Sequence, residues 1–152
     1  MIKISKILVP TDFSDNSAFA YPYANSLAKS YGAEVLLAYI SEHRLYPIRP
    51  GQGLGWDEHE EEEKAFVAEG LAKAREAFDA DLKVGTVHGE GRAFVELVRT
   101  ARAEGIDMIV ICTHGHTGMK HLLLGSTAEK VVRKAPCPVL TVHPGQWEFE
   151  MP

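Results

Sequence analysis

The sequence contains few cysteines and no hydrophobic run long enough to cross a membrane. Its 152 residues include only Cys112 and Cys137, which are too few for a disulfide framework and match no zinc-binding spacing. No apolar stretch approaches the roughly 18 residues of a transmembrane helix, and none follows the polar N-terminus. We therefore expect a soluble, cytoplasmic protein without a membrane segment, in which both thiols are reduced.

An excess of basic residues is also absent. The chain has 21 Asp and Glu against 16 Lys and Arg, a net charge of -5, and its basic residues are scattered along the sequence. Nucleic-acid-binding domains usually carry a basic stripe, so we expect no nucleic-acid partner. The length suits one domain, and we predict a single domain over residues 1–152.

Short apolar runs alternate with segments of helical spacing through the whole chain. The apolar runs cover residues 6–10, 35–40, 82–88, 108–112 and 138–142. Between them, apolar residues recur at intervals of three and four near residues 20–31, 67–78, 94–101 and 128–135. This alternation predicts an α/β fold of the Rossmann-like type, an open five-stranded parallel sheet with four helices divided between both faces. The nearly continuous hydrophobicity of the runs predicts strands buried on both sides.

Several local features accompany this pattern. Ser14 is placed to cap the first helix, and Pro22, beyond its first turn, should kink that helix. Glutamates between residues 58 and 63 open the second helix, where negative charge suits the helix dipole. The Pro- and Gly-rich segment 41–56 is either a lid or a mobile connection. The aromatic tail, with Trp147 and Phe149, either frays or packs on another subunit.

The most informative segment is a glycine-bearing loop, residues 113–127, between the fourth strand and the fourth helix. A helix N-terminus presents unpaired N–H groups, and the glycines Gly115, Gly118 and Gly125 allow an anion to approach the backbone closely. The loop is not a Walker A motif, because Gly125 is followed by Ser126 rather than by Lys. We predict a phosphate site, although any strand-to-helix loop uses glycine where φ must be positive.

Other loop residues allow a structural and a functional interpretation. Ser126 and Glu129 have the spacing of a capping box, which would partly satisfy the helix N-terminus. The hydroxyls of Ser126 and Thr127 could still face a ligand, and His114 or His116 could touch a phosphate. A metal site using these histidines, with His88 and His121, is less favoured because a rigid ligand spacing is missing.

Asp12 follows the first strand. In open parallel sheets, ligands bind at the carboxyl ends of the strands where the winding direction reverses. There an ionised Asp12 could accept hydrogen bonds from a ribose hydroxyl or an adenine amino group. The alternative is a turn residue that bonds its own backbone.

Three motifs together resemble the universal stress protein family over nearly the whole chain. They are Pro-Thr-Asp-Phe-Ser at residues 10–14, Thr113-His114-Gly115 followed after nine residues by Gly125-Ser126, and Ala-Pro-Cys-Pro-Val-Leu at residues 135–140. The resemblance implies strand order 3-2-1-4-5, a cytoplasmic protein that binds ATP or AMP, with Mg²⁺ as a candidate companion ion, and a homodimer joined through the fifth strand.

The resemblance also implies roles for individual residues. Carried over by position, Asp12 and the backbone of Ile40 would contact adenine. The adenine pocket would be shaped by Pro10 and Thr11. The ribose and phosphates would be held by Gly115, Gly125, Ser126 and Thr127. The first glycine of the family's G-x-x-G-x9-G-[S/T] pattern is replaced by Cys112. If its side chain obstructs the ligand, Cys112→Gly should tighten binding and leave melting of the free protein unchanged. If it points into the core, Cys112→Gly should loosen packing and leave affinity unchanged.

The leading hypothesis is therefore a dimeric adenine-nucleotide-binding stress-response sensor or regulator. A slow ATPase is an alternative, but it needs charge neutralisation and a positioned water. Lys120 is the only obvious cation of the loop, and no dedicated base can be named. A nucleotide-free interaction module is a further alternative. A phospho-receiver is disfavoured, because the fifth strand ends at His143 without the expected Lys.

Overall fold

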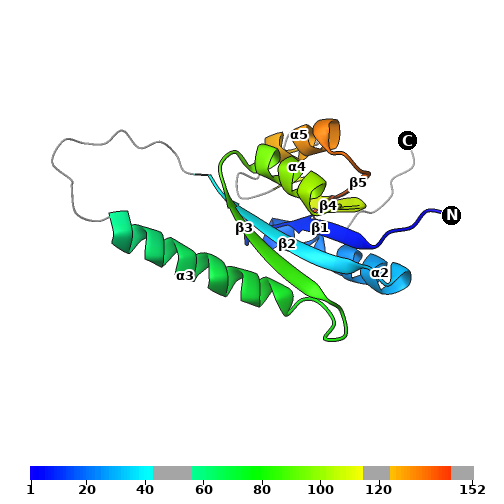
Figure 1. The fold of residues 1–152 in the computed structure, drawn as a ribbon, viewed down its shortest axis with the longest axis horizontal. Coiled ribbons are helices and arrows are strands. Elements are labelled where there is room, and N and C mark those ends of the chain that lie inside the picture. The colour runs from blue at the N-terminus through cyan, green and yellow to red at the C-terminus, as the bar shows by residue number, and fades with distance from the viewer. Residues whose placement is uncertain (43–55, 115–123, 145–152) are drawn as a thin grey trace.

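The computed structural model describes residues 1–42, 56–114 and 124–144. Five parallel strands form one sheet in the order β3-β2-β1-β4-β5 (Figure 1). Their bounds are β1 Lys6–Pro10, β2 Glu34–Ser41, β3 Val84–Glu90, β4 Met108–Cys112 and β5 Val139–Val142. The predicted α/β fold and strand order are confirmed, and β1 and β4 have the predicted bounds.

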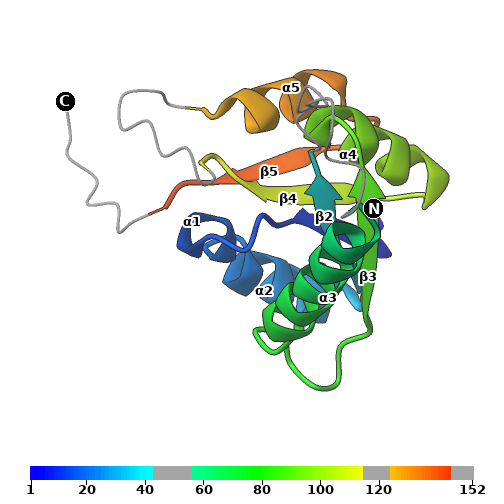
Figure 2. The ribbon, with the colours of Figure 1, turned by 90° about the vertical axis from the view of Figure 1, so that its left-hand side faces the viewer.

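Helices cover both faces of the sheet, as the sequence predicts (Figure 2). One face carries α1 Asp15–Ala18, α2 Tyr21–Tyr31 and α3 Trp56–Arg75, and the other carries α4 Ala93–Ala103 and α5 Ser126–Lys134. Successive strand residues point to opposite faces, so Val9 belongs to the core beneath α2 and α3 while Leu8 belongs to the core beneath α4 and α5. Both side chains are fully buried.

The first helical segment differs from its prediction. Ser14 does cap it, since its Oγ accepts the Ser17 N–H at 3.1 Å. However, α1 ends at Ala18 and a new helix, α2, begins at Tyr21 with Pro22 in its first turn. Proline is well tolerated there, because the N–H that it lacks would have no partner within the helix. Pro22 therefore starts a second helix instead of kinking the first.

The edge strand β3 is also less buried than predicted. None of its seven residues is fully buried, whereas four of five are buried in both β1 and β4. Since β3 pairs only with β2 within the described residues, it lacks the second neighbour that covers a central strand. The prediction of two buried faces thus holds for the centre of the sheet.

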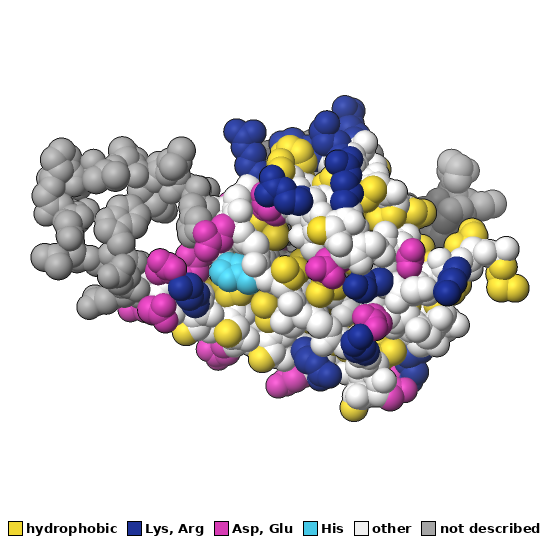
Figure 3. Space-filling view, viewed as in Figure 1, with side chains coloured by type: hydrophobic (Ala, Val, Ile, Leu, Met, Phe, Trp, Pro, Cys, Tyr) yellow, Lys and Arg dark blue, Asp and Glu magenta, His cyan; other side chains and the backbone are white. Residues whose placement is uncertain are grey.

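Charged side chains are distributed unevenly between the two helical layers. Figure 3 shows Lys and Arg side chains gathered over the α4 and α5 side, although the sequence scatters them. Ion pairs of Arg99 with Glu96 and of Arg133 with Glu129 neutralise part of this charge. On the opposite layer, α3 begins at Trp56, so the acidic run opens a helix as predicted.

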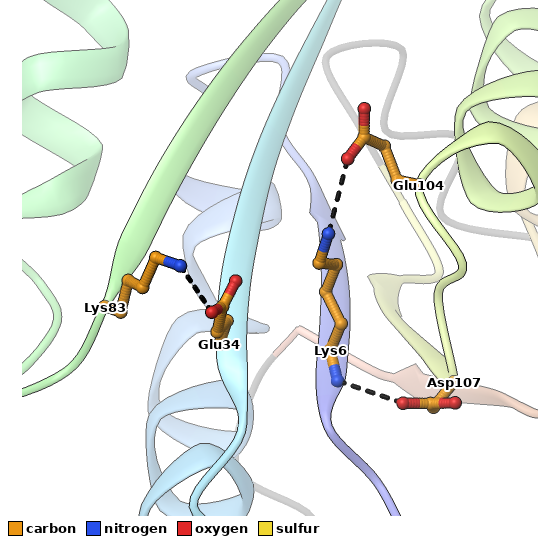
Figure 4. Close-up of polar contacts among 5 residues, drawn as sticks. All are labelled: Lys6, Glu34, Lys83, Glu104 and Asp107. Atoms are coloured by element: carbon orange, nitrogen blue, oxygen red, sulfur yellow. Dashed lines mark hydrogen bonds and ion pairs between the residues drawn. The ribbon is translucent and has the colours of Figure 1, made fainter.

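Polar contacts fix the strands at the amino edge of the sheet (Figure 4). The Asp107 carboxylate, just before β4, accepts the backbone N–H groups of Ser5 at 2.7 Å and Lys6 at 3.1 Å. The Lys6 ammonium pairs with Glu104 at 3.3 Å. The start of β1 is therefore attached to the start of β4.

The neighbouring strands β1 and β4 are paired only near their amino ends. β1 pairs with β2 over five residues but with β4 only at Ile7↔Met108 and Leu8↔Ile109. Their carboxyl ends are therefore free to diverge, and this is the point where the winding direction of the sheet reverses. Of the segment 41–56, predicted as a lid or a mobile connection, Ser41 ends β2 and Trp56 begins α3, and residues 43–55 lie outside the described residues. The aromatic tail with Trp147 and Phe149 lies outside them as well. Within the described ranges, no helix has the length and apolarity to span a bilayer.

Candidate functional site

A cavity of about 460 Å³ lies at the carboxyl ends of β1, β2 and β4 and reaches the starts of α4 and α5. This volume is within the range of small-molecule sites. Nine of the predicted site residues line it: Pro10, Thr11, Asp12, Ile40, Cys112, His114, Gly125, Ser126 and Thr127. The other three, Gly115, His116 and Gly118, lie outside the described residues. Segments more than a hundred residues apart in the sequence thus meet around one space.

Asp12 has both a local structural role and a place in the cavity wall. Its Oδ1 accepts the backbone N–H of Ser14 at 3.0 Å and also the Ser14 hydroxyl. The predicted turn interaction is therefore present. The same carboxylate lines the cavity, and its negative charge contributes, after burial and Glu63, to raising the pKa of the Tyr39 phenol above its usual value. Asp12 can orient its turn and face a ligand at the same time.

Thr11 organises the backbone beneath this turn. Its hydroxyl is buried and lies 3.2 Å from Ser17 Oγ and 2.5 Å from the Tyr21 hydroxyl. It also accepts the Phe13 N–H at 3.0 Å. Phe13 has φ 61°, a left-handed conformation that is uncommon for a bulky residue. Strained positions of this kind persist where surrounding contacts over-determine them, and they often lie beside functional groups.

The N-terminus of α5 forms the opposite wall of the cavity. Gly125, not Ser126, is the N-cap, and no side chain caps the helix. The predicted capping box is therefore wrong: Ser126 is already helical, and the Glu129 carboxylate lies 3.3 Å from Arg133 Nε. The first N–H groups of α5 remain without the side-chain acceptor that a capping box would supply. They form a favourable site for an anion.

Gly125 is required by close packing and not by a positive φ. Its φ is -67°, which any residue can adopt. Its N–H donates to the Thr113 carbonyl at 2.6 Å, and a Cβ at this position would lie only 2.8 Å from the same oxygen. The hydrogen bond joins the two ends of the loop, and the missing side chain allows it.

Thr113 links the loop to the edge strand, a connection that the sequence did not suggest. The residue is fully buried, and its N–H donates to Val142 at 2.8 Å. Its hydroxyl lies 2.9 Å from His114 Nδ1 and 3.0 Å from His143 Nδ1. His143 directly follows β5, so Thr113 connects the cavity residue His114 with the end of that strand.

The histidines are not brought together for metal binding in the described part of the chain. His88 lies in β3, and its Nε2 is 2.7 Å from the Oγ of Ser41 at the end of β2. Among the described residues, no group of three His, Cys, Asp or Glu side chains could hold a metal ion. His116 and His121 lie outside those residues.

Cys112 both lines the cavity and packs in the core. It is 6% exposed and belongs to the apolar cluster that contains Val110 and Val142. Burial is the largest cause of the raised pKa of its thiol, and the charge of Asp12 adds to it. The thiol is therefore uncharged at neutral pH. Its burial supports the alternative in which the side chain points into the core.

We expect Cys112→Gly to lower the free energy of unfolding by about 1 to 2 kcal/mol, because it removes a buried side chain and adds backbone freedom in a strand. This loss of stability is the outcome expected for a side chain that points into the core, whereas an obstructing side chain would leave melting unchanged. Nucleotide affinity should stay within about twofold of wild type. Denaturant unfolding and titration calorimetry test both parts, with Cys112→Ala as the control that retains Cβ. A clear gain in affinity for Cys112→Gly would show that the side chain obstructs the cavity.

Sequence comparison connects this arrangement with known proteins. The profile of the Universal stress protein family matches residues 3–143. Universal stress protein MJ0531 of Methanocaldococcus jannaschii is 38% identical over 138 residues, which cover 90% of this chain and 81% of that protein. The range matched by the family profile includes β1, the glycine-bearing loop and β5.

Solved structures agree with the fold. The structure of MJ0577 from M. jannaschii is 29% identical, covers 96% of this chain and all of that one, and superposes with a TM-score of 0.77. A universal stress protein in complex with cAMP has 24% identity and a TM-score of 0.66, with 93% of this chain and 99% of that chain covered. One from Archaeoglobus fulgidus in complex with dAMP has 21% identity and a TM-score of 0.60, with 93% and 98% covered. Because their sequence identities are below 25%, the last two structures show similarity of fold alone.

Proposed function

The chain belongs to the universal stress protein family, and from this premise we propose that it binds an adenine nucleotide, ATP or AMP, in the cavity between β1 and β4. The bound nucleotide would control a dimeric sensor or regulator of the stress response in the cytoplasm. The observation that carries the proposal is that Asp12 and the N-terminus of α5 line the same cavity. One wall offers a hydrogen-bond acceptor, and the other offers N–H groups for an anion.

The two walls suit different parts of a nucleotide. The carboxylate of Asp12 fits a ribose hydroxyl or the adenine amino group, which donate hydrogen bonds, and would repel a phosphate. Gly125, Ser126 and Thr127 fit the phosphates, with Mg²⁺ as a companion ion. Two proteins of the same fold were solved with cAMP and with dAMP, which supports an adenine nucleotide over other phosphorylated ligands.

Binding without catalysis is the function that the described cavity favours. Phosphoryl transfer needs cations that neutralise the transferring group. No Lys or Arg is among the described residues that line the cavity, and Lys120 lies outside those residues. We therefore propose a binding protein in preference to an ATPase.

A thermal-shift panel tests the proposed ligand class. ATP and AMP at millimolar concentration, with and without Mg²⁺, should raise the melting temperature, because a ligand that binds only the folded state stabilises it. GTP and inorganic phosphate serve as controls and should have smaller effects. Equal shifts with all four ligands would show a general anion site, and no shift with any of them would contradict the proposal.

We further propose that two chains pair through β5. This strand lies at the edge of the sheet, and three of its four residues are only partly buried. An exposed edge strand has unpaired backbone groups that can pair with another chain. In a dimer with twofold symmetry, the β5 strands of the two chains cover each other. Light scattering at tens of micromolar should give twice the 16.7 kDa of one chain. A monomer mass at that concentration would overturn the dimer.

A further inference from the structure

Phe66 forms an exposed aromatic surface in the wall of the cavity. It lies on α3 and is 57% exposed, although its neighbour Val67 is buried in the core. Tyr39 also lines the cavity, but its ring is stacked on Phe13 with centroids 4.5 Å apart and planes 3° apart. Of these two aromatic rings, Phe66 therefore offers more open surface to a ligand.

The Phe66 ring is supported by Phe13. The two rings meet edge to face, with centroids 5.7 Å apart and an interplanar angle of 77°. Phe13 in turn is confined on other sides by Tyr39 and by the backbone of α3 at Gly70, where a Cβ would lie 2.5 Å from its ring. Edge-to-face contacts between aromatic rings are favourable. Phe66 is therefore held by a chain of packed groups that also fixes the turn after Asp12.

This support places an aromatic ring and a hydrogen-bond acceptor on one side of the cavity. Phe13 contacts Phe66 and directly follows Asp12 in the chain. Aromatic side chains bind nucleobases by stacking, and a carboxylate accepts from the donors on the base or ribose. The N-terminus of α5 instead suits the phosphates.

We propose that Phe66 stacks on the nucleobase and makes this site selective for ligands that carry a base. The inference rests on the proposed function and adds to it the residue that recognises the base. It assigns to α3 a direct part in ligand binding, beside Asp12 at the end of β1, while the N-terminus of α5 binds the phosphates.

The test compares ligands with and without a base. For Phe66→Ala we expect AMP to bind about 5- to 150-fold more weakly than to wild type, the range for loss of one stacking contact. Ribose 5-phosphate, which has no base, should bind equally to both proteins. Phe66→Trp should retain AMP binding, because its ring also stacks. Tyr23→Ala is the matched control, since Tyr23 is 55% exposed on α2 and does not line the cavity.

Two further measurements separate stacking from a structural effect. Since Phe66 is largely exposed, Phe66→Ala should melt close to wild type in the absence of ligand. The fluorescence of 2-aminopurine riboside triphosphate should be quenched on binding to wild type, and less so in the fully bound Phe66→Ala complex. Equal AMP affinity of wild type and Phe66→Ala would overturn the inference and leave the proposed function intact. Failure of wild type to bind any adenine nucleotide would overturn both.

Discussion

Gly125→Asp is expected to weaken adenine-nucleotide binding at least about a hundredfold, so that calorimetry detects no heat. Aspartate is a good N-cap residue, so its carboxylate would accept the free N–H groups of α5 and compete with a phosphate for them. It would also repel the phosphate. Each charge-assisted hydrogen bond that is lost costs about 1.5 to 3 kcal/mol.

Two variants separate charge from size in this experiment. Gly125→Ala adds only a Cβ, which would approach the Thr113 carbonyl to 2.8 Å and force the ends of the loop apart. We expect an intermediate loss of affinity, because the N–H groups stay uncapped. Lys3→Asp, in the exposed N-terminal segment, is the control for added negative charge and should bind normally. A dissociation constant for Gly125→Asp within about twofold of wild type would show that α5 does not bind the phosphates.

Asp12→Asn is expected to weaken ATP and AMP binding about 10- to 150-fold. Asparagine retains an Oδ1 that can accept the Ser14 N–H, so the turn and the cap of α1 should survive. It loses the negative charge and replaces one acceptor oxygen by a donor. Hydrogen bonds to charged groups contribute about 1.5 to 3 kcal/mol, which gives this range.

The control for Asp12→Asn is Asp15→Asn, which neutralises an exposed carboxylate in the first turn of α1. Calorimetric titration of both variants, with their melting temperatures, distinguishes a ligand contact from a loss of fold. If Asp12→Asn and wild type bind ATP equally, Asp12 acts only in its turn, as the alternative interpretation of the sequence holds.

The central sheet could be predicted from sequence because hydrophobic runs report burial. β1 and β4 are buried on both sides and end at turn residues, so their bounds match the prediction. β3 is displaced by two residues from its predicted range, 82–88, because an edge strand has a weaker hydrophobic pattern. The gap between α1 and α2 was missed, since Pro22 fits both a kinked helix and a new first turn.

The site was predictable where a motif fixes the backbone and less so where distant side chains meet. Pro10, Asp12, Gly125 and Ser126 line one cavity as expected. The prediction of a capping box is wrong, because the spacing of Ser126 and Glu129 does not reveal that Gly125 packs against the Thr113 carbonyl and is the N-cap.

Phe66 was missed because it lies next to a core position on a helix with clear apolar spacing. Only the packing of α3 on the sheet shows that Val67 is buried while Phe66 reaches the cavity. The contact between Thr113 and His143 joins residues 30 positions apart and likewise depends on strand pairing. Both features depend on contacts between secondary-structure elements, which local sequence patterns do not reveal.

The most direct test of nucleotide binding between β1 and β4 is a calorimetric titration of the wild-type protein with ATP and with AMP. The proposal predicts saturable binding at one site per chain for at least one of them, and its loss in Gly125→Asp. Absence of heat for both nucleotides at millimolar concentration, together with no thermal shift, would contradict the account. Binding that survives unchanged in both Gly125→Asp and Asp12→Asn would contradict it equally, because the nucleotide would then occupy another site.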